Sequence, residues 1–231
     1  MEEEIKDNSQ RSKDITMVFY TFIAIDIIAI LLIIYQSYVL QSYEEDPTNM
    51  STIELLDIVV PVMRIVQFVI HIVSIVFFVR WFKRAYGNLI RKHQPMEYSE
   101  NGSAWGFFIP IVSLYRPITT AKEIYLKTQY AIREYNSNLK VDTDTSFIVI
   151  WWIFMIFNNM FSSYSSRKYD NAFDIASFVD ANAYAIISDV IDVVGIVLAL
   201  YVIYKITKVE TLLRDTNESV SSIDEIGTVI E

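Results

Sequence analysis

Five ionisable side chains within long apolar segments are the residues of this sequence best suited to chemistry. They are Asp26, Arg64, His71, Asp189 and Asp192. A charged side chain in hydrocarbon costs about 2.5–3.5 kcal/mol at mid-helix, so each needs a partner, water or a path to the membrane surface. Aspartate and histidine at mid-membrane are typical of proton and ion relays. The same residues can instead fix the register of packed helices.

Depth in the membrane predicts which of these residues meet. A helical rise of about 1.5 Å per residue, with antiparallel helices, places Arg64 at the level of Asp192 and of the neighbouring Asp189. The same estimate places Asp26 and His71 together near the middle of the membrane. We therefore expect an ion pair between Arg64 and Asp192 and a contact between Asp26 and His71.

The polar residues of the second apolar segment recur at steps of three and four. This spacing puts them on one stripe of a helix, which must face protein or water rather than lipid. The last apolar segment has a milder stripe of small and polar residues, of the kind that lets helices approach closely. The two stripes comprise Asp57, Pro61, Arg64, Gln67, His71 and Ser74, and then Ser188, Asp192, Gly195 and Ala199.

The segments that carry these residues are long enough to cross a bilayer. A spanning helix needs about 20 mostly apolar residues. A hydrophobic content of 53%, with only 5 Gly and 5 Pro, also differs from that of an ordinary soluble domain. The sequence therefore predicts an all-α integral membrane protein with four transmembrane helices, at residues 16–40, 55–82, 145–165 and 183–206.

Positive charges predict the orientation of the four spans. Three Lys and Arg precede the first span, none lies between the first two spans, and ten lie between Arg80 and Lys140. Because cytoplasmic loops are enriched in Lys and Arg, we expect both termini in the cytoplasm. We expect a tail at 1–15, one membrane domain at 16–208, and an acidic tail at 209–231 that frays and becomes disordered.

The sequence argues against catalysis, cofactors and nucleic-acid binding. Its two histidines, His71 and His93, are 22 residues apart, which is about 33 Å along one helix. Cysteine is absent, and the sequence has no metalloprotease motif, phosphate-binding glycine loop or nucleophile elbow. A net charge of -9 disfavours a nucleic-acid partner. We expect no enzyme, metal site or cofactor; the expected partners are the lipid bilayer and a second copy or another membrane protein.

The loop after the second span has two features that predict contact with the membrane surface. Trp81, Lys83 and Arg84 follow the span at the expected level of the lipid headgroups, where aromatic rings and cations anchor helices. Residues 118–138 carry apolar side chains at helical spacing, with charged residues on the remaining faces. This pattern predicts an amphipathic helix that lies on the membrane or docks on the bundle.

An apolar stretch too short to span the membrane lies between these two features. Residues 104–114 would reach only about 16 Å as a helix, about half a bilayer. Pro110 interrupts the stretch, and its apolar side chains would cover both faces of a helix, which is typical of a buried segment. We expect a re-entrant or interfacial segment at 104–117, with Arg116 at the membrane surface and Pro117 opening the next helix.

This part of the sequence resembles a known family. The segments "RWFKRAYGNL" (80–89), Tyr98-Ser99, "WGFFIPIVSLYRP" (105–117) and "KEIY" (122–125) look like the signature of a bacterial integral-membrane family, domain of unknown function four-three-two-eight. Family members typically have Trp at the position of Tyr115 and Asn at that of Ser113. The resemblance implies a bacterial inner-membrane protein and no established activity. The positions that match the motif are Trp81, Arg84, Tyr86, Asn88, Pro110, Arg116 and Pro117.

Two functions are compatible with the sequence. The favoured one is a non-enzymatic membrane module that assembles with itself or with other membrane proteins. The alternative is a small ion- or proton-conducting channel or transporter subunit that uses the intramembrane Asp, His and Arg residues. Four spans per chain are few for a transporter, so the alternative predicts an oligomer.

Overall fold

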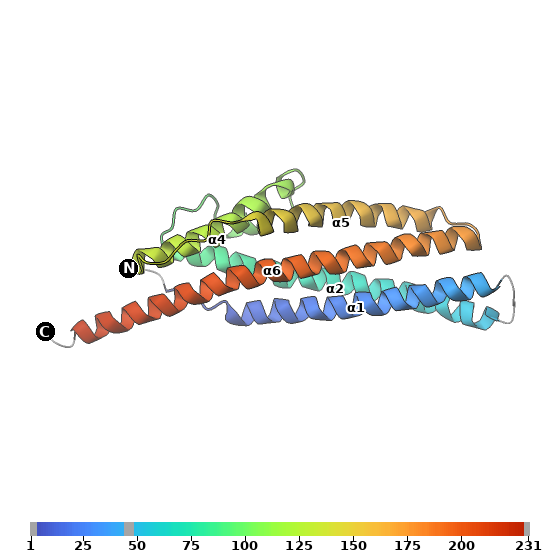
Figure 1. Cartoon of the computed structure of the whole chain (residues 1–231), viewed down its shortest axis with the longest axis horizontal. Helices are drawn as coiled ribbons and strands as arrows, with labels where there is room; N and C mark the ends of the chain where they lie inside the picture. The colour runs from blue at the N-terminus through green and yellow to red at the C-terminus, as the bar shows by residue number, and fades with distance from the viewer. Residues whose placement is uncertain (1–3, 44–48, 229–231) are drawn as a thin grey trace. The chain divides into compact units, whose positions relative to one another are not determined.

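The computed structural model describes residues 4–43 and 49–228 of the chain (Figure 1). All regular structure within these residues is helical, which confirms the predicted all-α fold. The helices are α1 (Ser9–Tyr43), α2 (Met50–Arg91), α3 (Glu100–Trp105), α4 (Arg116–Tyr135), α5 (Ser146–Asp170) and α6 (Ile175–Thr228), and a 3-10 turn, η2 (Val112–Leu114), precedes α4.

Four of the helices are long and apolar enough to cross a membrane, as the sequence predicts. They are α1, α2, α5 and the Ile175–Ser219 part of α6. The described part of α1 contains neither Gly nor Pro. Pro61 lies within α2 and has no amide to donate to the carbonyl of Asp57, but the helix continues through it.

The described residues form two compact units. Unit 1 is drawn from Met1–Thr16, Val76–Trp152 and Leu200–Glu231, and unit 2 from Met17–Ile75 and Ile153–Ala199. The unit boundaries fall within the four long helices, so each of these helices contributes residues to both units. The shorter elements α3, η2 and α4 belong to unit 1 alone.

The core of unit 1 is built around the last turns of α2. Trp81, Phe82 and Leu89 of α2 are at most 1% exposed, and so are Ile124 and Ile132 of α4. Burial of each such side chain contributes roughly 1.5–3 kcal/mol. Because the Trp81 side chain is enclosed by protein, its predicted role as an anchor at the lipid headgroups is wrong.

A Schellman motif terminates α2. The amide of His93 donates to the carbonyl of Ile90 at 2.9 Å, and that of Gln94 donates to the carbonyl of Leu89 at 3.0 Å. His93 has a φ of 52°, the left-handed conformation that glycine usually supplies at this position. The second histidine of the chain therefore lies just beyond the end of the helix that carries His71.

Two buried side-chain amides hold extended segments of unit 1. Asn88 of α2 accepts a hydrogen bond from the Lys6 amide at 3.1 Å and donates to the Lys6 carbonyl at 2.9 Å. Gln129 of α4 accepts from the Asp142 amide at 2.8 Å and donates to its carbonyl at 3.1 Å. Each amide thus pairs with the backbone of one residue as a neighbouring β-strand would. We call these two arrangements the amide clamps.

The helix α6 extends well past the predicted span. Leu213 is 2% exposed and clusters with Ala131 and Ile132 of α4, and Arg214 pairs with Asp7 at 2.9 Å. These contacts stabilise the first turns after residue 209, where the sequence predicts fraying. Residues 209–228 are helical rather than disordered, and the last three residues of the predicted tail lie outside the described chain.

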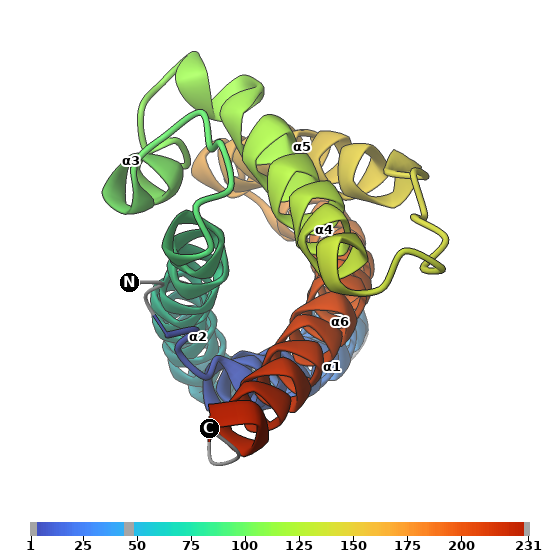
Figure 2. The same cartoon turned by 90° about the vertical axis from the view of Figure 1, so that its left-hand side faces the viewer.

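Residues 104–117 form a series of turns rather than one helix. Ser99 caps α3 by accepting a hydrogen bond from the Gly102 amide at 3.1 Å, and α3 ends at Trp105. The turns and η2 follow, and Pro117 lies in the first turn of α4, as expected. Figure 2 shows α3 and these turns beside α4. Several apolar side chains here are exposed, so the expected packing on every side is not observed.

In unit 2, small residues bring α5 and α6 together. A Cβ atom added to Gly195 of α6 would lie 3.5 Å from the sulfur of Met155 and 3.6 Å from the ring of Phe154. The small and polar stripe that the sequence predicts on α6 therefore lies against α5. The charged residues of the spans gather in this unit.

The clamp formed by Asn88 can be tested with a near-isosteric change. Asn88→Asp replaces the amide donor with an oxygen that repels the Lys6 carbonyl, so we expect the free energy of unfolding to fall by about 1–3 kcal/mol. Thermal or denaturant unfolding of the purified protein in detergent measures the loss. Asn136→Asp is the matched control, because Asn136 is exposed and its side-chain oxygen remains an acceptor for the Asn138 amide. Equal stability of the two variants would contradict a stabilising clamp.

Candidate functional site

A polar cavity of about 260 Å³ lies in unit 2 and is lined by α1, α2, α5 and α6. All five ionisable residues predicted from the sequence line it: Asp26, Arg64, His71, Asp189 and Asp192. Each helix contributes at least one polar side chain from a segment that is otherwise mostly apolar. The structure thus brings together residues that are as much as 166 positions apart in the sequence.

Arg64 pairs with Asp189 rather than with the predicted partner, Asp192. The Arg64 Nη1 atom lies 2.9 Å and 3.0 Å from the two carboxylate oxygens of Asp189. Asp192 instead accepts a hydrogen bond from Asn158 Nδ2 at 2.8 Å. The two aspartates are three residues apart on one face of α6, so depth alone could not distinguish them.

Gln67 joins the ion pair to Asp26. Its side-chain oxygen accepts from Arg64 at 2.7 Å, and its Nε2 atom donates to Asp26 Oδ1 at 2.8 Å. The resulting chain of polar contacts runs from Asp189 through Arg64 and Gln67 to Asp26. Gln67 lies on the polar stripe predicted from the sequence, but its bridging role was not predicted; its spacing of three from Arg64 was the available signal.

Asp26, which was predicted to contact His71, forms its hydrogen bond with Gln67. Asp26 is bound by Gln67, whereas the His71 ring lies edge-on to Phe22, with 5.9 Å between the ring centroids. Asp26 is 1% exposed, and its Oδ2 atom has no hydrogen-bond partner among the described residues. Asp26 and His71 nevertheless line the same cavity, so a small polar guest could contact both.

The charges around the cavity do not balance. Three carboxylates face one arginine and one histidine, and the arginine is engaged by Asp189. The hydrogen-bond donors to Asp26 and Asp192 are the neutral amides of Gln67 and Asn158. A buried carboxylate with no cationic partner requires water, a bound cation or a proton. Among the described residues, no group of three or more His, Asp or Glu is placed to hold a metal ion.

The motif residues near the end of α2 lie in unit 1, where they join several segments. The carbonyl of Trp81 accepts from Asn8 at 3.2 Å, and Asn88 forms the amide clamp with Lys6. The hydroxyl of Tyr86 donates to Glu123 at 2.8 Å and accepts from the Tyr98 amide at 2.9 Å. Burial raises the pKa of Tyr86 above its usual range.

Three of the four remaining motif residues, Pro110, Arg116 and Pro117, lie in the turns before α4 or in its first turn, and Arg84 lies on α2. The Arg116 guanidinium stacks on the Tyr98 ring, 4.3 Å from its centroid. A Cβ atom on Gly106 would clash with the Cδ atom of Arg116, so only glycine leaves room for this stack. Arg84 is half-buried, Pro110 is exposed and Pro117 is buried.

Comparison with family models assigns the chain to a family. Residues 45–208 match the model of a family described as Domain of unknown function (DUF4328). The chain belongs to the DUF4328 family. No curated protein and no solved structure matches it. For this DUF4328 protein, the chemistry of the site has to come from its own residues.

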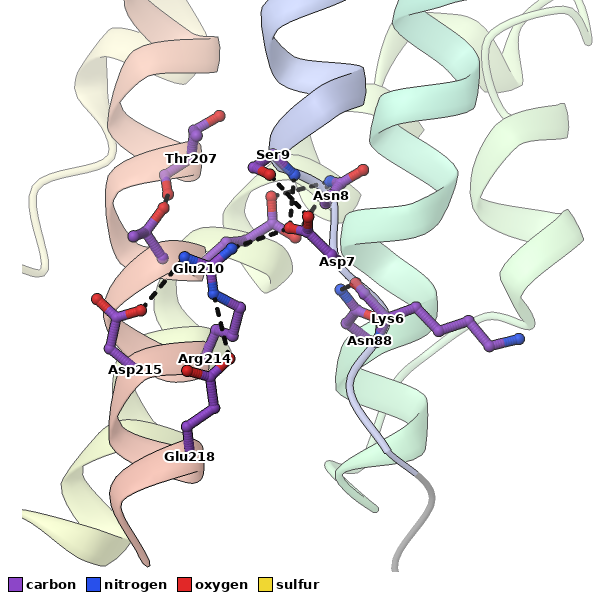
Figure 3. A network of polar contacts seen from close by, with 11 residues as sticks. Lys6, Asp7, Asn8, Ser9, Asn88, Thr207, Glu210, Arg214, Asp215 and Glu218 are labelled. Carbon is purple, nitrogen blue, oxygen red and sulfur yellow. Dashed lines mark hydrogen bonds and ion pairs between the residues drawn. The ribbon is translucent and has the colours of Figure 1, made fainter. Parts of the chain in front are cut away.

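A second polar cluster of the DUF4328 protein lies in unit 1, beside a cavity of about 20 Å³ (Figure 3). Asn8 Nδ2 donates to the two carboxylate oxygens of Glu210 at 3.0 Å and 3.2 Å. Asp7 pairs with Arg214 on the next turn of α6. Glu210 lies beyond the predicted end of the last span. Burial raises the pKa of Glu210 to about 7, against the opposing effect of the Asn8 hydrogen bond.

The raised pKa of Glu210 predicts a pH-dependent stability. In the folded state Glu210 keeps its proton up to about pH 7, whereas in the unfolded state it releases the proton near its ordinary pKa of 4.5. The protonated Glu210 therefore stabilises the folded state fully below pH 4.5, and this contribution is lost as the pH rises through 7. Between pH 4.5 and 8 we expect the free energy of unfolding of the wild type to fall by on the order of 2 kcal/mol relative to that of Glu210→Gln. Unfolding in detergent at several pH values measures the difference. A difference between the two proteins that does not change with pH would refute the assignment.

Removal of one partner of the Arg64–Asp189 pair should destabilise unit 2. Asp189→Leu leaves the Arg64 cation without its carboxylate, and we expect the free energy of unfolding to fall by about 2–4 kcal/mol. This loss is smaller than that for a fully buried pair because the Arg64 side chain is 33% exposed. The double variant Arg64→Leu/Asp189→Leu should recover most of the loss, since no unpaired charge remains. Thermal unfolding of both variants tests the pair; a double variant no more stable than the single one would show that the residues are not coupled.

Proposed function

We propose that this protein is a non-enzymatic proton-binding protein of the bacterial inner membrane that acts as a small channel or transporter subunit. We also propose that both termini lie in the cytoplasm, which the distribution of Lys and Arg supports. The observation that carries the proposal is the Oδ2 atom of Asp26, which is buried without a hydrogen-bond partner in the described residues and belongs to a residue that lines a polar cavity.

A proton is the ligand that best suits the residues around the cavity. Asp26 and Asp192 are each bound by an amide, and a neutral carboxylic acid is compatible with such a partner in a low-dielectric site. The described residues offer no metal-binding cluster. A cavity of about 260 Å³ is large enough for several water molecules, which can carry protons between side chains.

His71 supplies a second titratable group for a relay. Its ring lines the cavity together with Asp26 and Asp192, and an imidazole can accept a proton at one nitrogen and release another at the second. The ionisable groups that line this cavity are Asp26 from α1, Arg64 and His71 from α2, and Asp189 and Asp192 from α6; α5 contributes Asn158, Asn159 and Ser162. A step from Asp26 through water to His71 or Asp192 would move a proton within unit 2.

A membrane assembly module, the function favoured by sequence, is the second candidate. Its supporting observation is that three polar contacts in unit 2 join different helices: Arg64 to Asp189, Gln67 to Asp26 and Asn158 to Asp192. Such contacts can serve only to hold helices in register. A proton path built from four spans would itself require several copies of the chain, so a homo-oligomer or another membrane protein is part of both proposals.

Proton flux after Asp26→Asn distinguishes the two candidates. In vesicles loaded with a pH-sensitive dye and driven by a potassium diffusion potential, we expect the variant to reduce proton flux by roughly tenfold or more, because it removes the titratable group. Asp57→Asn is the matched control: Asp57 lies on the same polar stripe but is exposed, and the variant should conduct like the wild type.

The abundance and oligomeric state of each variant complete the test. Loss of flux with unchanged assembly supports the proton path. Loss of assembly in detergent and in native mass spectra supports the assembly module instead. A wild type that gives no more flux than empty vesicles, or an Asp26→Asn variant that conducts fully, would rule out the proposed path. A sodium gradient without a pH change is the control for conduction of other ions.

A further inference from the structure

One side of the turns at residues 105–115 packs against aromatic residues of unit 1. The Phe107 ring lies 5.6 Å from Phe78, 5.0 Å from Phe82 and 5.6 Å from Trp152, measured between ring centroids. The Trp152 Nε1 atom donates to the carbonyl of Ser113 at 2.9 Å. One side of this segment is therefore fixed to α2 and α5 by packing and by a hydrogen bond.

The other side of the same segment is apolar and uncovered. Ile111 is 77% exposed and Trp105 is 62% exposed, and other large apolar or aromatic side chains of the same segment are exposed as well. A group of exposed apolar side chains of this kind is typical of a site that contacts a membrane or another apolar partner. We call it the apolar wedge, and it consists of Trp105, Phe108, Ile109, Ile111, Leu114 and Tyr115.

The backbone holds the tip of the apolar wedge outward at an energetic cost. Ile111 has a φ of 67° and a ψ of -50°, and the amide of Val112 donates to the carbonyl of Pro110 at 2.8 Å. These features define a γ-turn with positive φ, which is rare and strained. A positive φ is unusual for a β-branched residue, so a smaller or more flexible residue would fit the backbone better. Strain of this kind is typical of positions kept for function.

The contacts of Phe107 place the apolar wedge at the level of the span ends. Phe78 lies four residues before the predicted end of the second span, and Trp152 lies seven residues after the predicted start of the third. Ile150, two residues before Trp152 on α5, is apolar and 55% exposed, as suits a helix that crosses the acyl-chain region at this level. Basic residues then follow on α2, where Arg80 is exposed and Lys83 and Arg84 are half-buried. A helix end at which apolar side chains give way to cations suits the boundary between acyl chains and headgroups.

We propose that the apolar wedge inserts into the cytoplasmic leaflet, where its partner is the acyl-chain region of the lipids. Ile111 is the tip, and the aromatic residues lie nearer the headgroups. The insertion rests on the proposed topology but not on the proton path. It also revises the expected re-entrant segment: the protein covers only one side of these turns, and lipid covers the other.

The absence of cysteine allows a direct test with the whole protein in lipid vesicles. Ile111→Cys is labelled with the environment-sensitive fluorophore NBD, in vesicles of phosphatidylcholine and phosphatidylglycerol that carry nitroxide groups on their acyl chains. We expect the fluorescence of this label to be quenched roughly twofold or more relative to Asn136→Cys, which is the control because Asn136 is exposed at the polar end of α4. Phe108→Cys should behave like Ile111→Cys.

Each outcome of the quenching experiment decides the insertion. Emission typical of water, or quenching no stronger than that of the Asn136→Cys label, would overturn it and point to a protein partner for the apolar wedge. Quenching only by nitroxides in the leaflet opposite the two termini would overturn the cytoplasmic placement. The label at position 111 should be quenched equally in an Asp26→Asn background, so failure of the proton path leaves this result intact.

Discussion

The structure depends on one constraint: a polar group within an apolar helix needs a partner on another helix. In unit 2 this constraint is met by a chain of contacts from Asp189 through Arg64 and Gln67 to Asp26, and by the separate contact of Asn158 with Asp192. An unpaired charge in hydrocarbon costs several kcal/mol, so few arrangements of the four helices satisfy all these groups at once. The polar residues therefore specify how the helices of unit 2 pack, whatever chemistry they also perform.

Unit 1 meets the same constraint differently, because it contains extended segments as well as helices. Their backbone amides and carbonyls cannot pair within the segment, and buried side chains of neighbouring helices pair with them instead. Asn88 does so for Lys6, and Gln129 does so for Asp142. The aromatic core around Trp81 and Phe82 supplies the apolar surface on which these segments pack. Much of the segment "RWFKRAYGNL" is thus explained by packing and by backbone pairing.

Periodicity and hydropathy were enough to predict the four apolar helices and the stripe on α2, because these features depend on local sequence. The five residues around the cavity were also found from the sequence, since a charge in an apolar run is conspicuous. Their partners were not: Asp189 and Asp192 share a face of α6, and the rotation of one helix against another decides which of them meets Arg64. Trp81 was assigned to the lipid surface because its burial depends on residues distant in sequence. One of these is Trp151, whose ring packs against Phe78, and Phe78 in turn packs against Trp81.

The amide clamps also bear on which substitutions the chain can tolerate. Asn88 pairs with the main-chain amide and carbonyl of Lys6, and the Lys6 side chain is exposed. Most amino acids present the same two groups, whereas proline lacks the amide. The clamp therefore tolerates nearly any residue except proline at position 6. Position 88 needs a side chain that can both donate and accept a hydrogen bond. A segment can diverge freely in sequence and still keep its place in the fold.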